Sequence, residues 1–232
     1  MFFVWEENFI MAEVRLPGEI ERRSMEIIAR ELAERGILLP PDVQSLVHRV
    51  IHATADFDFA SSLVFTEDAV KLAVEALQKG TPIITDTNMA KAGISAVALK
   101  RLKTEVHCFM AEPSVVERAG KMGTTRAVAA MQVAAERFPG AVFAIGNAPT
   151  ALFQLCEEIR NGLRPALVIG VPVGFVNVVE SKEQILAVCR KHQVPAVVAL
   201  GRKGGSSVAV AICNALLYTA SGLTDPSARG WN

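Results

Sequence analysis

From residue 62 to the last helical run, short apolar segments alternate with longer helical ones, and this alternation is the strongest constraint on the fold. The apolar runs lack the polar–apolar alternation of a strand with one wet face, so we expect strands that are buried on both faces of a parallel sheet. Right-handed crossovers then give a doubly wound α/β fold, a Rossmann-like three-layer arrangement with helices on both faces of a mainly parallel sheet of about five to six strands. The predicted strands are residues 82–85, 105–110, 141–145, 166–170 and 196–200.

Two amphipathic helices are predicted ahead of this body, one over residues 18–35 with Gly36 as its stop and one beginning at Pro41. The sequence contains no internal repeat or long linker, which favours a single α/β domain over residues 1–232. Residues 1–12 are expected to be an N-terminal extension and residues 221–232 a C-terminal tail. The remaining helices are predicted at 66–79 (with Thr66 as cap), 124–138, 149–160 and 181–191, with a short one after the turn at 86–88 and a last one that follows residues 204–207 and runs through Tyr218.

Charge and cysteine content exclude several classes of function. The 24 basic and 24 acidic residues cancel, so the overall charge favours neither nucleic acid nor an anionic membrane surface. No apolar run reaches the roughly 18 residues that a membrane span needs. The four cysteines form no Cys-x-x-Cys pair, which argues against a zinc ribbon and indicates reduced thiols in a cytoplasmic protein; they are Cys108, Cys156, Cys189 and Cys213.

The segments that follow the predicted strands are rich in glycine and polar residues, and ligands of such sheets bind beyond the carboxyl ends of the strands. Arg126 and Arg202 come at or just before helix N-termini, where a cation opposes the helix dipole. Either an anionic ligand balances them, or their side chains bend back to solvent or to a carboxylate. The chain lacks the Gly-x-Gly-x-x-Gly dinucleotide fingerprint, the Gly-x-x-x-x-Gly-Lys phosphate loop and the Gly-x-Ser-x-Gly nucleophile elbow.

His52 is the main candidate for chemistry. The apolar positions of its helix share one side, and His52 lies on the other with Arg49 one turn earlier. It is either a proton-transfer group over an anionic ligand or an ordinary surface histidine. His48 and His52 are spaced to bind a metal, but no third ligand is evident, so no metal site is expected. Ser24, on the preceding helix, either faces a pocket or bonds to its own helix backbone.

Several motifs occur in an order that resembles the precorrin-8X methylmutase family, including its cobalt-precorrin-8 counterpart, over roughly residues 18 to 217. The Gly-Asn-Ala-Pro-Thr-Ala-Leu and Pro-Val-Gly-Phe-Val blocks are the most specific. The matching segments are Glu21-Arg22-Arg23-Ser24, Val50-Ile51-His52-Ala53, Gly123-Thr124-Thr125-Arg126, residues 144–152, residues 170–176, Glu180-Ser181-Lys182 and residues 201–206.

The resemblance implies an isomerase that moves a methyl group from carbon 11 to carbon 12 of a tetrapyrrole without an added cofactor, giving hydrogenobyrinate or cobyrinate. It also implies a homodimer whose pockets involve the subunit interface. The histidine that matches His52 is the family's acid/base. Ser24, Arg49 and Arg126 match substrate contacts, and we carry Thr87, Arg202 and Ser206 as pocket residues from their loop positions.

Two alternatives stay open beside this interpretation. One is a non-catalytic corrinoid-binding or carrier protein of the same fold, and the other is an unrelated isomerase or nucleotide-binding enzyme. The helical pattern and the resemblance together predict that His52 faces a cleft lined by the loops near Arg126 and Gly204.

Overall fold

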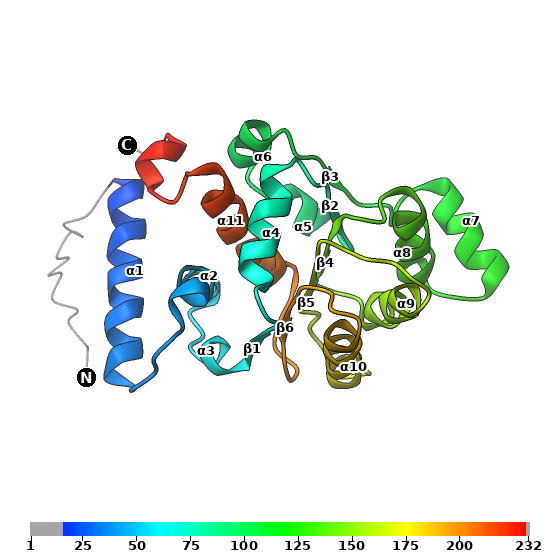
Figure 1. Cartoon of the computed structure of the whole chain (residues 1–232), viewed down its shortest axis with the longest axis horizontal. Coiled ribbons are helices and arrows are strands. Elements are labelled where there is room, and N and C mark those ends of the chain that lie inside the picture. Colours follow the sequence, from blue (N-terminus) through cyan, green and yellow to red (C-terminus); the bar gives the residue numbers. More distant parts are fainter. Residues whose placement is uncertain (1–15, 231–232) are drawn as a thin grey trace, which may run out of the picture.

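A computed structural model describes residues 16–230 of the chain, so the predicted N-terminal extension lies outside the described residues. Its centre is a six-stranded sheet in the order β1-β6-β5-β4-β2-β3 (Figure 1). All neighbouring strands are parallel except β1, which runs antiparallel to β6 at one edge. The predicted mainly parallel α/β sheet is confirmed; its strands are β1 (Leu63–Phe65), β2 (Ile83–Thr85), β3 (Val106–His107), β4 (Val142–Ile145), β5 (Leu167–Gly170) and β6 (Ala196–Ala199).

Helices cover both faces of this sheet, as predicted (Figure 1). One face carries α3 (Phe59–Ser62), α4 (Ala69–Gln78), α5 (Asn88–Gly93), α6 (Ala96–Leu102) and α11 (Ser206–Ser221), with α2 (Pro41–Thr54) packed on α11. The other face carries α7 (Pro113–Met122), α8 (Arg126–Arg137), α9 (Pro149–Arg160) and α10 (Val178–Lys191).

The central strands are apolar throughout because they feed two separate cores. In β4, Val142 and Ala144 belong to the core on the α11 side, whereas Phe143 and Ile145 belong to the core on the α9 side. Helix α11 lies between α2 and the sheet, so it is buried around most of its circumference and its sequence is apolar on all sides.

The first helix, α1 (Pro17–Glu34), adds a layer outside the three that the sequence predicts. It packs on α2 and on the short 3-10 helix η1 (Pro226–Arg229), at the left end of Figure 1. The segment after α11, which the sequence predicts to be a tail, is therefore held against α1, and Arg229 within it is buried.

Four local features differ from the predictions. The antiparallel strand β1 was not predicted, because three residues show no strand periodicity, and α7 was not predicted either. Thr66 does not cap α4: its hydroxyl accepts a hydrogen bond from the Ala196 N–H at 2.8 Å, and Asp68 directly precedes the helix. The strand predicted over residues 105–110 contains only the two residues of β3.

The loop after β6 crosses the end of β5 so closely that only glycine fits at position 204. A Cβ atom on Gly204 would lie 2.2 Å from the Val171 carbonyl oxygen and 2.7 Å from that of Pro172.

We expect Gly204→Ala to lower the free energy of unfolding by about 1–3 kcal/mol, measured by urea denaturation, because backbone atoms have to move. Gly120→Ala in α7 is the control, since no atom lies within 4 Å of its Cβ position and alanine favours a helix. Equal stabilities of the two variants would contradict the close approach.

Candidate active site

Helices α1 and α2 are joined by two polar contacts on successive turns. Arg49 Nη2 donates to Glu21 Oε1 at 2.6 Å, and the Ser24 hydroxyl is hydrogen-bonded to His52 Nδ1 at 2.7 Å. Both pairs are 28 residues apart in sequence, so they act as two rungs that share one register between the helices. The apolar side of α2 is buried as predicted, which leaves His52 on the opposite, exposed side.

A cavity of about 540 Å³ opens beside the Ser24–His52 rung. Its wall is mostly apolar and comes from α1, α2 and Phe57, and Arg23 and Glu31 add one charge of each sign. Of the two alternatives for Ser24, the structure supports the pocket-facing hydroxyl, because its oxygen contacts the imidazole of another helix. The cavity offers apolar surface for a ring system and one ionisable group that can exchange a proton with it.

The surroundings of His52 favour its neutral form. Burial lowers the pKa of His52 below the ordinary 6.5, and the positive charge of Arg49 adds to this effect, while Glu21 opposes it. Because Ser24 engages Nδ1, the other ring nitrogen, Nε2, is left for a ligand. The serine hydroxyl can donate or accept, so it supports the imidazole in either tautomer. This pairing suits a residue that gives a proton and takes it back.

Arg49 is held by a buried cluster rather than left free for a ligand. Glu21 Oε1 accepts from Arg49 Nη2 and also from Arg229 Nη2, each at 2.6 Å, and both guanidinium groups lie over the Tyr218 ring. Burial alone would raise the pKa of Glu21, but hydrogen bonds from the two arginines and their charges bring it below its ordinary value. The charges of all three residues act on His52.

Two further candidates, Thr87 and Ser206, meet at the carboxyl end of the sheet. Their hydroxyl oxygens lie 2.8 Å apart, and the Thr87 oxygen also caps α5 by accepting from the Ala90 N–H. Ser206 and Arg49 line one cavity of about 350 Å³ between α2, α5 and α11. A Cβ on Gly146 would lie 2.8 Å from the Ser206 Cα, so glycine lets the turn after β4 reach the start of α11.

Asp86, which the sequence reasoning did not single out, fixes the crevice of the sheet. The chain reverses its direction of strand addition between β2 and β4, and ligands of doubly wound sheets bind at such a point. The Asp86 carboxylate spans it, accepting N–H bonds from Gly146, Asn147 and Ala148 at 2.9, 2.8 and 2.7 Å. Burial raises the pKa of Asp86, and the three N–H bonds oppose that shift. The donors ahead of α9 are therefore already occupied by a carboxylate of the chain itself.

Lys182, which the sequence places in a family motif without a role, holds the loop after β6. Its side chain is fully buried, and Nζ donates to the Gly201 and Lys203 carbonyl oxygens at 2.8 and 2.7 Å. Burial lowers the pKa of Lys182 to about 8. The same loop is tied to the end of α2, because Lys203 Nζ lies 2.7 Å from Asp56 Oδ2 and 2.6 Å from Asp58 Oδ2.

Neither Arg126 nor Arg202 lines the His52 cavity. Arg126 is exposed at the start of α8, on the opposite face of the sheet from α2. Arg202 is exposed in the loop after β6, and its guanidinium lies 5.5 Å from the centre of the Phe175 ring. The prediction that the loops near Arg126 and Gly204 line the His52 cleft is wrong within one chain, because α1, α2 and Phe57 form that lining.

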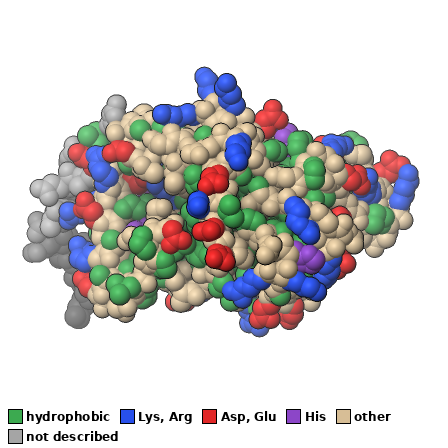
Figure 2. Space-filling model, in the orientation of Figure 1, with side chains coloured by type: hydrophobic (Ala, Val, Ile, Leu, Met, Phe, Trp, Pro, Cys, Tyr) green, Lys and Arg blue, Asp and Glu red, His purple; other side chains and the backbone are tan. Residues whose placement is uncertain are grey.

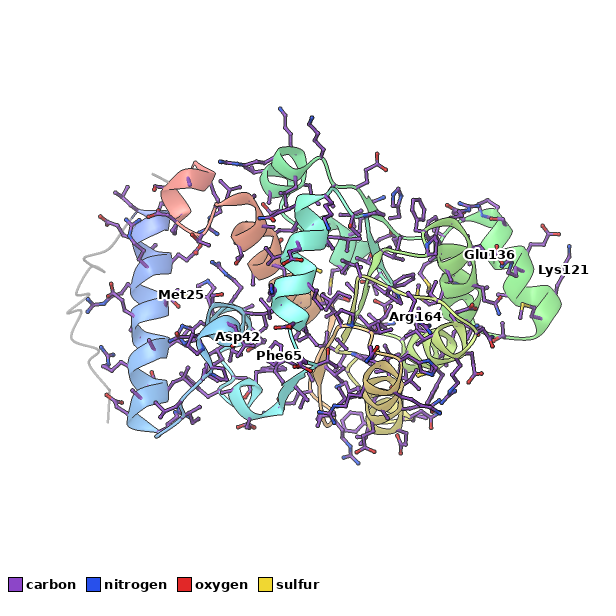
Figure 3. The ribbon with its side chains drawn as sticks, viewed as in Figure 1. Met25, Asp42, Phe65, Lys121, Glu136 and Arg164 are labelled. Atoms are coloured by element: carbon purple, nitrogen blue, oxygen red, sulfur yellow. The ribbon has the colours of Figure 1, made fainter. Side chains whose placement is uncertain are left out.

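The α1–α2 pair and the α7–α8 pair lie at opposite ends of the molecule (Figure 3). Figure 3 places Met25 of α1 and Asp42 of α2 towards one end of the molecule, and Glu136 of α8 with Lys121 of α7 at the other. Figure 2 shows basic and acidic side chains interspersed over the face in view, without one large region of a single sign.

In the described part of the chain, no helix is long and apolar enough to cross a membrane. Within residues 16–230, no three His, Cys, Asp or Glu side chains are grouped to hold a metal ion.

Fold and site together define an α/β protein in which one histidine, set by a neighbouring serine, faces a largely apolar pocket beside the carboxyl edge of a parallel sheet. Residues 19–219 match the family model described as precorrin-8X methylmutase. The chain belongs to the precorrin-8X methylmutase family, a family of isomerases.

Individual relatives agree with this assignment. The chain is 44% identical to the cobalt-precorrin-8 methylmutase of Salmonella typhimurium over 212 residues, which cover 90% of this chain and 98% of the relative. It is 40% identical to the precorrin-8X methylmutase of Pseudomonas aeruginosa over 198 residues, which cover 85% and 93% of the two chains. The crystal structure of a precorrin-8X methylmutase from Thermus thermophilus matches with a TM-score of 0.79 at 40% identity, over 88% of this chain and 98% of that one.

The buried Lys182 ammonium makes stability depend on pH. Its pKa is about 8 when folded, against 10.5 for an ordinary lysine, so between these values the unfolded chain binds the extra proton and stability rises with pH. We expect the free energy of unfolding of the unmodified protein, relative to Lys182→Met, to rise by about 1–3 kcal/mol from pH 8 to 10.5 in urea titrations. Lys191→Met, at an exposed position of the same helix, is the control and should follow the unmodified protein. A constant difference between the unmodified protein and Lys182→Met would contradict this prediction.

Proposed function

We propose that this protein moves the methyl group on carbon 11 of precorrin-8X, or of its cobalt counterpart, to carbon 12, and that His52 donates and recovers the proton that eases the shift. The observation that carries the proposal is the Ser24–His52 pair beside an apolar cavity in a chain of the methylmutase family. Where cobalt is present, it is part of the substrate. The reaction consumes no cofactor, because it only relocates a methyl group within one molecule.

The chemistry asks for little covalent help from the protein. Protonation of a ring nitrogen makes the conjugated system electron-poor, the bond from carbon 11 to the methyl group breaks as the bond to carbon 12 forms, and the proton then returns. The pKa of His52 is lowered by burial and by Arg49, so its imidazolium is a stronger acid than that of an ordinary histidine. The same environment stabilises the neutral imidazole once the proton has been donated. Ser24 orients the ring by holding Nδ1, which directs Nε2 to the substrate.

The occupied crevice of the sheet argues against the nucleotide-binding alternative. A phosphate group binds such folds through free N–H groups at a helix N-terminus. The N–H groups of Gly146, Asn147 and Ala148 already bond to Asp86, so they are not free to bind a phosphate. This supports a substrate that binds outside the crevice, across α2 and the strand-end loops.

We further propose that the protein acts in the cytoplasm as a homodimer and that each pocket draws on both subunits. The His52 cavity contains a single arginine, Arg23, together with the acidic Glu31, whereas a tetrapyrrole brings several carboxylates. Arg126 lies across the sheet from His52, so a second copy of the chain is the simplest source of its guanidinium at the same substrate. Arg202, beside the exposed Phe175 ring, then lies at the rim with Thr87 and Ser206 deeper along the sheet edge.

Replacement of His52 tests the catalytic role. We expect His52→Ala to lower kcat for the conversion of precorrin-8X to hydrogenobyrinate by about 10²–10⁴-fold, followed by absorption spectroscopy, because general acid–base catalysis contributes that much. The matched control is His48→Ala, one turn earlier on α2, whose side chain lines a different cavity. Near-normal turnover by His52→Ala would sink the proposed role. A protein that binds the tetrapyrrole but leaves its spectrum unchanged after release would instead be the non-catalytic carrier.

Mixed dimers test the shared pocket. If His52 of one subunit works with Arg126 of its partner, a mixture of His52→Ala and Arg126→Ala chains restores one intact site in each mixed dimer. With random exchange, half of the dimers are mixed and carry one good site of two, so we expect about a quarter of the unmodified activity. Activity no higher than that of either variant alone, with subunit exchange verified by mass spectrometry, would place both residues in one chain's site or outside it.

A further inference from the structure

Arg229 lies beyond the residues that match the family model, yet it is one of the most deeply buried charges of the described chain. Its side chain is 3% exposed, and Nη2 bonds to Glu21 Oε1 at 2.6 Å across 208 residues of sequence. The same guanidinium lies 4.3 Å from the centre of the Tyr218 ring. These contacts join η1, α1 and α11 immediately next to the α1–α2 rungs.

The contacts form a chain that ends at His52. Arg229 and Arg49 share one oxygen of Glu21, so Glu21 is held from two directions. Glu21 and Ser24 are three residues apart on α1, and Arg49 and His52 are three residues apart on α2, which makes the two rungs consecutive. A shift of Glu21 along or around α1 would therefore displace Ser24 from the imidazole.

We propose that Arg229 is a positioning residue for His52: through Glu21 it fixes the register in which Ser24 meets the imidazole, and it completes the charge cluster that His52 senses. The inference rests on the acid/base role proposed for His52. The C-terminal segment is thereby part of the active-site architecture, although its arginine does not line the His52 cavity.

The charge cluster predicts a pattern of His52 pKa shifts that differs from the pattern expected if the substitutions only loosened α1. After the larger effect of burial, the charges of Arg49 and Arg229 each lower the pKa of His52, because they disfavour the imidazolium form, and the charge of Glu21 raises it. Removal of the Arg229 charge therefore raises the His52 pKa, whereas removal of the Glu21 charge lowers it. Loosening of α1 would admit water and raise the pKa in both variants.

Other charged groups near His52 are constant across these variants. Among residues 16–230, these groups are Arg23 and Glu31 on α1, Arg49 on α2, and Asp56 with its partner Lys203 just beyond α2, and none of them is replaced in any variant. A shift that differs in sign between the Arg229 and Glu21 variants is therefore assigned to the cluster.

The experiment is an NMR titration of the His52 imidazole in the substrate-free protein, with its signal assigned among the four histidines by its absence from His52→Ala. We expect an upward pKa shift in Arg229→Gln and a downward shift in Glu21→Gln. Arg22→Gln is the matched control, because Arg22 also links α1 to the C-terminal segment, 3.6 Å from Asp225, but is exposed. That variant should titrate like the unmodified protein.

No shift in a folded Arg229→Gln, or shifts of the same sign in the Arg229 and Glu21 variants, would overturn the proposal. Should Glu21→Gln fail to fold, Arg229→Lys decides: it retains the charge, so His52 should titrate as in the unmodified protein, and a shift equal to that of Arg229→Gln would overturn the proposal. Because the titration needs no substrate, its outcome is independent of turnover. Opposite shifts without methyl transfer would leave the positioning intact and reject the proposed function alone.

Discussion

The bond network of Asp86 is the constraint on which the active end of this molecule depends. One buried carboxylate accepts three N–H groups from the turn after β4, so the ends of β2 and β4 are locked at the point where the sheet changes direction. That lock occupies the place where many doubly wound proteins bind phosphate. It also sets the Gly146 turn against the start of α11, and α11 in turn carries α2 and its histidine.

The reactive group, the His52 imidazole, comes from a helix that lies outside the sheet. Helix α2 brings His52 to the sheet edge, and α1 supplies Ser24 to one ring nitrogen. The two helices share an apolar core that includes Ile28 and Leu32 of α1, and a buried ion cluster fixes their register, since a buried carboxylate between two guanidinium groups tolerates little displacement. The polar contacts between α1 and α2 thus fix the orientation of the His52 ring, while the wall of the cavity beside it is mostly apolar.

The sequence predicts what depends on local pattern. Continuous apolar runs follow from two-sided burial, so the parallel sheet and its helices could be predicted, and the helical spacing of α2 placed His52 on its open side. Asp86 could have been found, because a carboxylate directly after a buried strand at the switch point needs donors. Contacts between distant segments leave no such pattern: the Arg229–Glu21 pair spans 208 residues, and the positions of Arg126 and His52 on opposite sides of the sheet follow from topology.

The central claim is that His52, in its protonated form, starts the methyl shift. The most direct measurement is the pH dependence of kcat/KM of the unmodified enzyme, compared with the titration of His52 in the same free protein, because kcat/KM reports the ionisation of the free enzyme. The account predicts that kcat/KM is lost as the pH rises through the His52 pKa, below the ordinary 6.5, since only the imidazolium can donate. A profile that stays flat through that pKa would contradict it.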